Sequence, residues 1–462
     1  MTRNASWAVD GSPAAAGAHG PPLGRPPRIR KTSGRPDPAR APAPGPARAP
    51  APHSGTVEDP APDTGPGRAR ALPGRLIGID LARGLAVFGM FSVHVGPEPT
   101  VGGPVGFALE AARGRSSALF ALLAGFSLII ITGRPRPRTG REGRQAAARV
   151  VIRGIVLIAL GYALTALDGP VNVILSFYGL LFLVVLPLHR LRARTLAAIA
   201  AATALAMPPV LYTVRAAAQD GHGLDAVTAW DPLARITGTD GVTELLFTGD
   251  YPVLTWMPFM LAGMAVARLD LARPGVRRRL TLAGGALALL GYGGSWLALH
   301  LVPRALTTVA AATGAGSASS AWWSDAVGEP PRRAPSAWLL VAAPHSETTF
   351  SAVGNTGIAL MVVAACLTVA DRLPRVTHLA APVAAVGMTA LTVYVLHVVA
   401  LWFFDDVWYV VPVDDDGMAA LPVLLGFVAA AVLLATAWTR RFRRGPLEHL
   451  LHLATRPARL VR

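Results

Sequence analysis

The stretch 76-LIGIDLARGLAVFGMFSVHV-95 has the length and apolar character of a helix that crosses a lipid bilayer. About 20 residues of α-helix cover the hydrocarbon core of a membrane. Apolar runs of this kind recur along the rest of the chain, separated by polar segments. We predict ten transmembrane helices, at about 76–95, 116–133, 147–167, 171–189, 195–214, 251–269, 280–302, 351–370, 380–403 and 418–438.

The composition agrees with a membrane protein. Hydrophobic residues make up 52% of the chain and charged residues only 15%, whereas soluble proteins carry about 25% charged residues. The net charge of +16 comes from short arginine clusters between apolar runs. These clusters are not interleaved with aromatic residues, so we predict no nucleic-acid binding. The single cysteine, Cys366, lies inside an apolar run, where we expect it to pack between helices.

The charges of the loops predict the orientation of the helices. Basic loops alternate with loops that are poor in arginine and often acidic, and basic loops face the cytoplasm. We therefore predict an all-α polytopic transmembrane bundle of about ten helices, multi-pass in the plasma membrane, with both termini in the cytoplasm. The basic segments are 134–144, 190–194, 268–279, 371–375 and 440–444, and the acidic ones are 220–225, 231–235 and 405–416.

Three regions of different composition follow. Residues 1–74 are rich in Pro, Ala and Arg without apolar periodicity, so they are expected to form a disordered cytoplasmic tail. Residues 75–440 form the predicted transmembrane domain, and 441–462 a basic cytoplasmic segment. Arginine far outnumbers lysine, and Ala, Gly and Pro are abundant. This bias is typical of a high-GC bacterium and suggests an actinobacterial source.

The first predicted span carries three polar side chains that lipid would not tolerate. Asp80 and Arg83 are three residues apart and share a helix face. Arg83 and His94 are eleven apart, which is close to three turns or about 16 Å along the axis. Such residues usually face the interior of a bundle and mark a functional path. A structural ion pair and an interfacial histidine are the alternatives.

A second polar cluster lies in the ninth predicted span, 387-GMTALTVYVLHVVALW-402. Tyr394 and His397 are three residues apart, so they lie on one face. Since this helix is predicted to run outward, His397 should lie at a depth similar to that of His94. A purely structural role for His397 stays open.

Further polar residues border the predicted outer surface. Arg115 opens the second span, and His345, Glu347 and Asn355 lie where the chain enters the eighth. Hydrogen bonding within the loop is the alternative for His345, Glu347 and Asn355. The sequence contains no HExxH, paired CxxC, phosphate-loop or GxSxG motif, so we predict no metal site.

Several of these segments resemble known families. Arg83, followed after ten residues by His94, resembles the first-helix signature of the bacterial integral-membrane O-acyltransferases, and 387-GMTALTVYVLH-397 resembles their later motif. The YeiB-type bacterial membrane proteins, which share a broader grouping with heparan-alpha-glucosaminide N-acetyltransferase, are more similar still. That similarity rests on 75-RLIGIDLARGLAVFGM-90, 114-GRSSALFALLAG-125 and 445-GPLEHLL-451.

The resemblance implies an acyltransferase of the membrane. It would move an acyl group, by expectation acetyl, from cytoplasmic acyl-CoA to a small-molecule or glycan acceptor on the outer side. Its residues would divide into three groups by role. The catalytic group is His94, His397 and Tyr394, the donor-binding group is Asp80, Arg83 and Arg115, and the substrate mouth is His345, Glu347 and Asn355.

Two other classes of function fit the same residues. Buried polar side chains also mark the substrate paths of transporters and flippases, although the chain shows no internal repeat. A scaffold or sensor without chemistry is the third reading. The lipid bilayer is the expected partner, with a homodimer as a candidate assembly. The acceptor and the acyl chain stay open.

Overall fold

The computed structural model describes residues 76–219, 231, 233–234, 241–328, 330–331, 333–404 and 418–462. All of them belong to one compact unit, residues 71–462. Within these ranges the chain forms helices and no strands, which confirms the predicted all-α class. The predicted tail, 1–74, and the acidic segments 220–225 and 405–416 lie outside the described residues.

The helices follow the apolar runs of the sequence closely. They are α1 (Ile77–Val95), α2 (Gly103–Ala112), α3 (Arg115–Thr132), α4 (Gly140–Thr165), α5 (Leu175–Val185), α6 (Ala193–Gln219), α9 (Gly241–Thr243), α10 (Val253–Ala267), α11 (Pro274–Ala288), α12 (Gly294–Leu301), α13 (Ala305–Thr313), α14 (Thr349–Arg372), α15 (Pro374–Leu379), α16 (Ala381–Met388), α17 (Ala390–Phe403), α19 (Leu421–Arg441) and α20 (Pro446–Ala454). The shorter turns η1 to η7 join them, among them η2 (Leu186–Arg190), η4 (Leu289–Gly293) and η6 (Ser336–Leu340).

The number of membrane-crossing helices differs from the prediction of ten. Among the described residues, seven helices are long and apolar enough to cross a membrane, and a bent pair, α16 with α17, makes an eighth if it counts as one span. The predicted fourth and sixth spans correspond to the shorter apolar helices Leu175–Arg190 and Val253–Ala267. The count of ten is therefore not confirmed.

The helix α10 is too short to cross a bilayer, and its position inside the bundle explains why. Its 15 residues rise about 22 Å, less than the roughly 30 Å of a hydrocarbon core. Nearly all of its residues are buried, packed against α3 and α6. A helix surrounded by protein does not have to match the thickness of the lipid, because neighbouring helices cover its ends.

The ninth predicted span is broken. α16 and α17 meet at Thr389 with a bend of 81°. The break leaves the last carbonyl groups of α16 and the first amide groups of α17 without partners inside a helix. Polar side chains must satisfy these groups, because lipid cannot.

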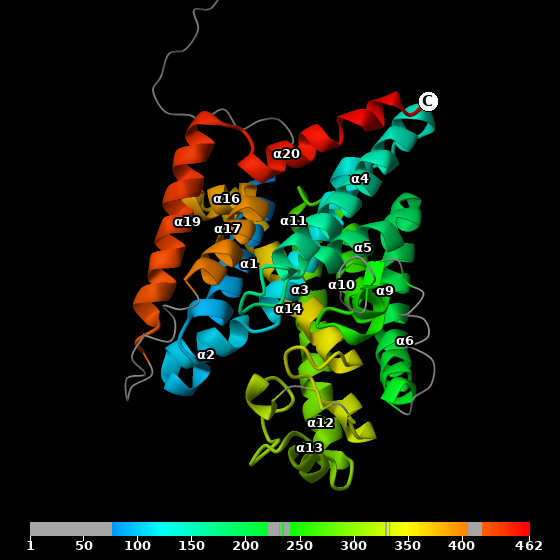
Figure 1. Cartoon of the computed structure of the whole chain (residues 1–462), viewed down its shortest axis with the longest axis vertical. Coiled ribbons are helices and arrows are strands. Elements are labelled where there is room, and N and C mark those ends of the chain that lie inside the picture. Colours follow the sequence, from blue (N-terminus) through cyan, green and yellow to red (C-terminus); the bar gives the residue numbers. More distant parts are fainter. Residues whose placement is uncertain are drawn as a thin grey trace, which may run out of the picture. The chain divides into compact units, whose positions relative to one another are not determined.

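The basic loops meet at one end of the bundle, as the alternation of charge predicted. Arg134 donates to the carbonyl oxygens of Ala267 and Leu269, and Arg268 donates back to Gly133. Figure 1 shows α20 and the C-terminus at this end, with α12 and α13 at the opposite one. We refer to the two ends as the predicted cytoplasmic and outer ends.

Glycines bring α1 close to its neighbours. A Cβ added at Gly84 would collide with the backbone of Val383 on α16, and one at Gly89 with the hydroxyl of Ser116 on α3. A Cβ at Gly387 of α16 would collide with the backbone oxygen of Asp80. Small residues of this kind let membrane helices pack backbone to backbone.

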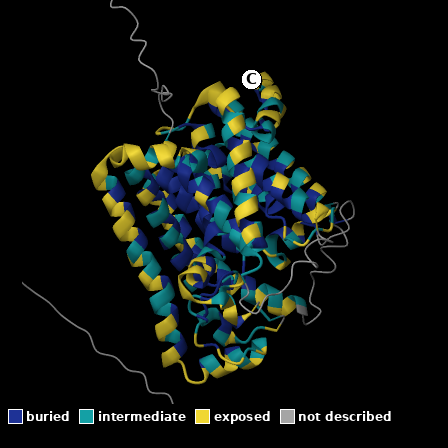
Figure 2. Cartoon of the chain, turned by 90° about the vertical axis from the view of Figure 1, so that its left-hand side faces the viewer, coloured by how far each residue is buried: buried dark blue, intermediate teal, exposed yellow. Residues whose placement is uncertain are grey.

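The segment from α12 to α14 forms a small core of its own at the predicted outer end. It includes Leu299, Val309, Trp338 and Val341, all buried. Figure 2 shows buried residues gathered between the helices, with exposed residues along the outward faces of the bundle. The small core holds the loop that enters α14, so it determines where the predicted mouth residues lie.

Candidate active site

A pair of histidines joins α1 to α17. His94 lies in the last turn of α1 and His397 within α17. Nδ1 of His94 is 2.9 Å from Nε2 of His397. The two rings stack, with 5.2 Å between centroids and 6° between planes. Residues 303 positions apart in the chain are thus in direct contact, at the shared depth that the sequence predicted.

The hydrogen bonds of the pair determine which nitrogen carries each proton. Nδ1 of His397 lies 2.7 Å from the backbone oxygen of Tyr394. Because a carbonyl oxygen only accepts, this Nδ1 holds a hydrogen and Nε2 of a neutral His397 holds a lone pair. His94 then donates from Nδ1 and keeps a lone pair on its own Nε2. No residue that the structure describes hydrogen-bonds to that Nε2, so the pair presents one basic nitrogen.

Aromatic side chains fix the ring of His397. The ring centroid of Phe91 lies 4.9 Å from that of His397, and the ring of Tyr394 meets it edge-on at 5.2 Å. The hydroxyl of Tyr394 points elsewhere and accepts a hydrogen bond of 3.2 Å from the amide of Ile174. Tyr394 therefore contributes its backbone carbonyl to the histidine pair and anchors α17 to the segment before α5.

Asp80 and Arg83 form the predicted ion pair, 3.0 Å apart, with 13% and 20% of their side chains exposed. The guanidinium of Arg83 also donates to the hydroxyl of Ser127 on α3 at 3.1 Å and to the carbonyl of Gly387 at 3.2 Å. Gly387 is in the last turn of α16, where carbonyl groups lack helical partners. A cation is favourable at that end of a helix, so Arg83 stabilises the break.

Glu448 performs the matching role on the other side of the break, and sequence reasoning did not single it out. Its carboxylate accepts from the amides of Leu391 and Thr392, at 2.8 and 3.3 Å, and from the Thr392 hydroxyl at 2.6 Å. It thereby caps the N-terminus of α17 from α20. In the sequence, Glu448 lies in 445-GPLEHLL-451, after the last predicted span. Nothing in that segment indicates a contact with α17.

The three predicted mouth residues come together. His345, Glu347 and Asn355 line one cavity of about 20 Å³, which has room for about one water molecule. Trp256 of α10 donates from Nε1 to Glu347 at 3.0 Å, and the hydroxyl of Thr255 donates to the same carboxylate. The surrounding protein raises the pKa of Glu347 to about 7, chiefly because burial disfavours the carboxylate.

Arg115 organises the mouth from the start of α3. It is buried and donates from Nε to the hydroxyl of Tyr292 at 2.9 Å, and from Nη2 to the carbonyl of Trp323 at 2.6 Å. The Tyr292 hydroxyl donates in turn to Oδ1 of Asn355 at 2.6 Å, and Asn355 donates to Ser351. This chain of hydrogen bonds fixes the orientation of the Asn355 amide toward the cavity.

The backbone of the mouth is strained. His345 and Glu347 have φ angles of +54° and +57°, a left-handed conformation that side chains other than glycine adopt with a cost. Nearby hydrogen bonds hold this conformation, including one of 3.0 Å from Nε1 of Trp338 to the carbonyl of Ser346. Strain of this kind is concentrated at functional sites. No pattern in 344-PHSE-347 predicts it.

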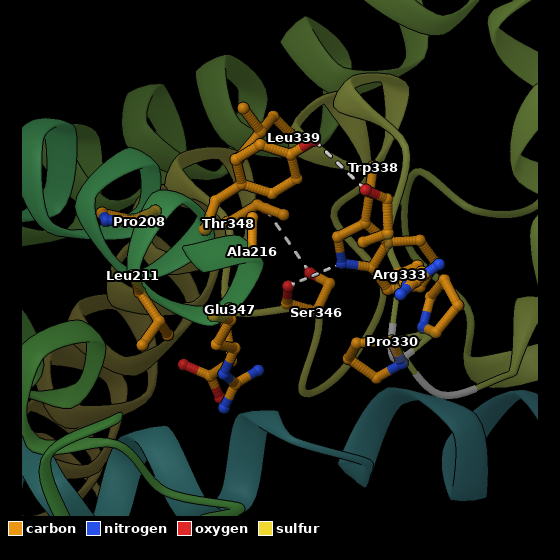
Figure 3. A pocket seen from close by; sticks show the side chains of 14 residues that line it. Pro208, Leu211, Ala216, Pro330, Arg333, Trp338, Leu339, Ser346, Glu347 and Thr348 are labelled. Carbon is orange, nitrogen blue, oxygen red and sulfur yellow. Dashed lines mark hydrogen bonds between the residues drawn. The ribbon is translucent and has the colours of Figure 1, made fainter. Parts of the chain in front are cut away.

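A larger pocket of about 230 Å³ lies beside the mouth. Its walls come from α6, with Tyr212 and Arg215, and from the segment between α12 and α14. Figure 3 shows Glu347 at one side of this pocket and Arg333 at the other. Arg215 interacts electrostatically with Glu347. The pocket therefore combines two guanidinium groups with aromatic surface.

The pocket, the mouth and the histidine pair are neighbours. Glu347 lines both the larger pocket and the smaller cavity, and His345 lies within electrostatic range of His94. Across the described ranges, no three His, Cys, Asp or Glu side chains gather in a way that could hold a metal ion. The outer pocket and the mouth thus share Glu347, and His345 of the mouth lies near the histidine pair.

Two family models match the chain. The model described as "Heparan-alpha-glucosaminide N-acetyltransferase, catalytic" matches residues 75–298, and the one described as "Protein of unknown function (DUF418)" matches residues 332–457. No curated protein matches the chain significantly. His94 falls within the first match and His397 within the second, so the histidine pair links the two matched regions.

Proposed function

We propose that this chain, a member of the YeiB-like family of membrane proteins related to heparan-alpha-glucosaminide N-acetyltransferase, is a transmembrane acyltransferase. In this proposal it lies in the plasma membrane and takes its acyl group from cytoplasmic acyl-CoA. The acceptor is a small molecule or glycan on the outer side. The open Nε2 of His94, supported by His397, is the observation that carries the proposal.

The pair can act as a general base. Nε2 of His94 would take the proton of an acceptor hydroxyl or amine as that atom attacks the thioester carbonyl. A carbon–oxygen or carbon–nitrogen bond forms and the carbon–sulfur bond breaks. The proton then passes from His94 to the leaving thiolate. His397 stabilises the imidazolium of His94 through the bond at Nδ1, in the way that the third member of a catalytic triad supports its histidine.

The acceptor would bind in the outer pocket, and the mouth residues would direct its reacting hydroxyl or amino group toward His94. Arg215, Arg333 and the aromatic wall of that pocket suit a polar or anionic acceptor such as a sugar derivative. Asn355 and Glu347 can exchange hydrogen bonds with its hydroxyl or amino groups. Because Arg115 orients Asn355 at this end, we assign Arg115 to the mouth and leave Asp80 and Arg83 as the candidates for the donor side.

The test is release of CoA thiol from acetyl-CoA by the purified protein in vesicles, with glucosamine as the acceptor probe. The only cysteine of the chain, Cys366, is buried, so a thiol reagent reports released CoA with little background. His94→Ala should lower the rate by a factor of about 10²–10⁴. His300→Ala, which removes an exposed histidine of α12, should leave it unchanged. A His94→Ala protein with the rate of the natural chain would refute the proposal.

Transport is the second candidate, because the bend between α16 and α17 resembles the broken helices that build substrate sites in transporters. The two candidates differ in their response to CoA. An acyltransferase is stabilised by CoA binding, whereas a transporter without this chemistry is not. Thermal unfolding in detergent with and without CoA separates them.

A further inference from the structure

An apolar groove of about 610 Å³ lies between α1, α17 and α19. Figure 1 shows α19 at the edge of the bundle beside α16 and α17. Its walls include Val423, Gly426 and Leu434 of α19 and Phe404 at the end of α17. Among the groups that line it, His397 is the only titratable one. The groove thus brings an apolar surface directly to the histidine pair.

The groove has the depth of one membrane leaflet. Its α19 wall extends from Val423 to Leu434, eleven residues or about 16 Å of helix, which is about half of the hydrocarbon core. α19 starts at the predicted outer end of the bundle and ends near the basic residues Arg440 and Arg441. The groove therefore lies in the outer half of the membrane.

Small residues on α19 keep the groove open. A Cβ added at Gly426 would meet no atom within 4 Å, so the space beside this glycine is empty. Ala430 and Ala431 continue the same wall. Phe91 and Phe427, which also line the groove, pack against each other with 6.0 Å between ring centroids.

We propose that this groove binds the hydrocarbon chain of the acyl donor, and that the transferred group is a long-chain acyl group rather than acetyl. The inference rests on the proposed acyl transfer. A thioester that arrives from the cytoplasmic end with its carbonyl at the histidine pair directs the rest of its acyl chain toward the outer half of the membrane. The apolar groove lies there, and burial of each methylene of the chain favours binding.

The test compares acetyl-, octanoyl- and palmitoyl-CoA by the rate of CoA release. The natural chain should favour palmitoyl-CoA over acetyl-CoA at least tenfold in kcat/KM. Gly426→Leu should fill the groove and reduce this ratio at least tenfold, and Ala430→Leu should act in the same direction. Ala429→Leu is the matched control, because Ala429 is exposed on α19 outside the groove, and should keep the ratio.

The outcomes distinguish the proposed binding of the acyl chain in the groove from the proposed acyl transfer. Equal kcat/KM for the three thioesters would overturn the groove assignment and leave acyl transfer standing. Absence of CoA release with every thioester would overturn the proposed function. In that case, stabilisation of the natural chain by palmitoyl-CoA, lost in Gly426→Leu, would still support the groove. Stabilisation that depends only on added phospholipid, or only on a lipid-linked acceptor, would overturn it.

Discussion

The two polar clusters along α1 differ in how many of their hydrogen-bonding groups have partners within the protein. Near the predicted cytoplasmic end, Arg83 is matched by Asp80, by Ser127 and by the carbonyl of Gly387. At the predicted outer end, His94 hydrogen-bonds to His397, and no other described residue hydrogen-bonds to its Nε2. A cluster whose charged groups are paired holds helices together, whereas a cluster with an open nitrogen can exchange protons. We therefore expect the first to control stability and the second to control activity.

The largest effect should come from the outer cluster. His397→Ala removes the group that supports the His94 imidazolium, so it should lower CoA release by a factor of about 10²–10⁴, as His94→Ala does. The double variant should lose little more, because residues that act as one unit are not additive. Rates of the two single variants and the double variant measure this coupling. Independent, multiplicative losses would show that the histidines do not act as a pair.

The inner cluster should respond in stability. Arg83→Met removes the cation that pairs with Asp80 and with the end of α16, so it should cost about 3 kcal/mol of unfolding free energy. Thermal unfolding in detergent measures the loss. Asp80→Asn added to Arg83→Met should recover part of it. Unchanged stability together with weaker binding of CoA would instead support the donor-binding role predicted for Arg83.

The mouth adds a dependence on pH. The pKa of Glu347 is raised to about 7 from its usual 4.5, so the folded protein binds this proton more tightly than the unfolded chain. The resulting stabilisation is complete below the usual pKa and is lost as the pH rises through about 7. Thermal stability of the natural chain should thus decline between about pH 5 and pH 8 relative to Glu347→Gln. Parallel curves for the two proteins would contradict the assignment.

The smallest effect concerns the break between α16 and α17. Glu448→Ala removes the cap of α17 and should cost about 1–2 kcal/mol. Since α17 carries His397, the rate of CoA release should fall as well. Glu142→Ala, at an exposed position in the first turn of α4, is the matched control and should cost only a few tenths of a kcal/mol. Equal effects of the two substitutions would remove Glu448 from the support of α17.

Much of the fold followed from local patterns. The apolar runs predicted the ends of the long helices to within about seven residues, and the arginine clusters predicted which loops share an end. The count of crossings did not follow, because α10 and the Leu175–Arg190 segment are apolar enough for spans but too short. Hydropathy measures only how strongly a segment prefers an apolar environment. It does not distinguish a helix that faces lipid from one that other helices surround.

The candidate site was predicted in part. Spacing placed Asp80 beside Arg83 and put His94 and His397 at similar depth, and both expectations match the geometry. Spacing could not predict that the hydroxyl of Tyr394 points away from His397 while its backbone carbonyl orients the His397 ring. It also gave no sign that Glu448 reaches α17 from α20, since contacts between distant segments leave no periodic trace in a single sequence.

The sequence alone determined that the chain is an all-α membrane protein, how its basic loops are distributed, and which polar residues lie inside its spans. These properties depend on the free energy of transferring each side chain from water to lipid. That free energy is set by the residue type, so it can be read from the sequence. Only the tertiary structure decided that the ninth span breaks at Thr389 and that His94 meets His397. It also decided that the Nε2 of His94 stays open. Those properties depend on which backbone and side-chain groups find partners across the bundle, and that is settled only when the helices pack.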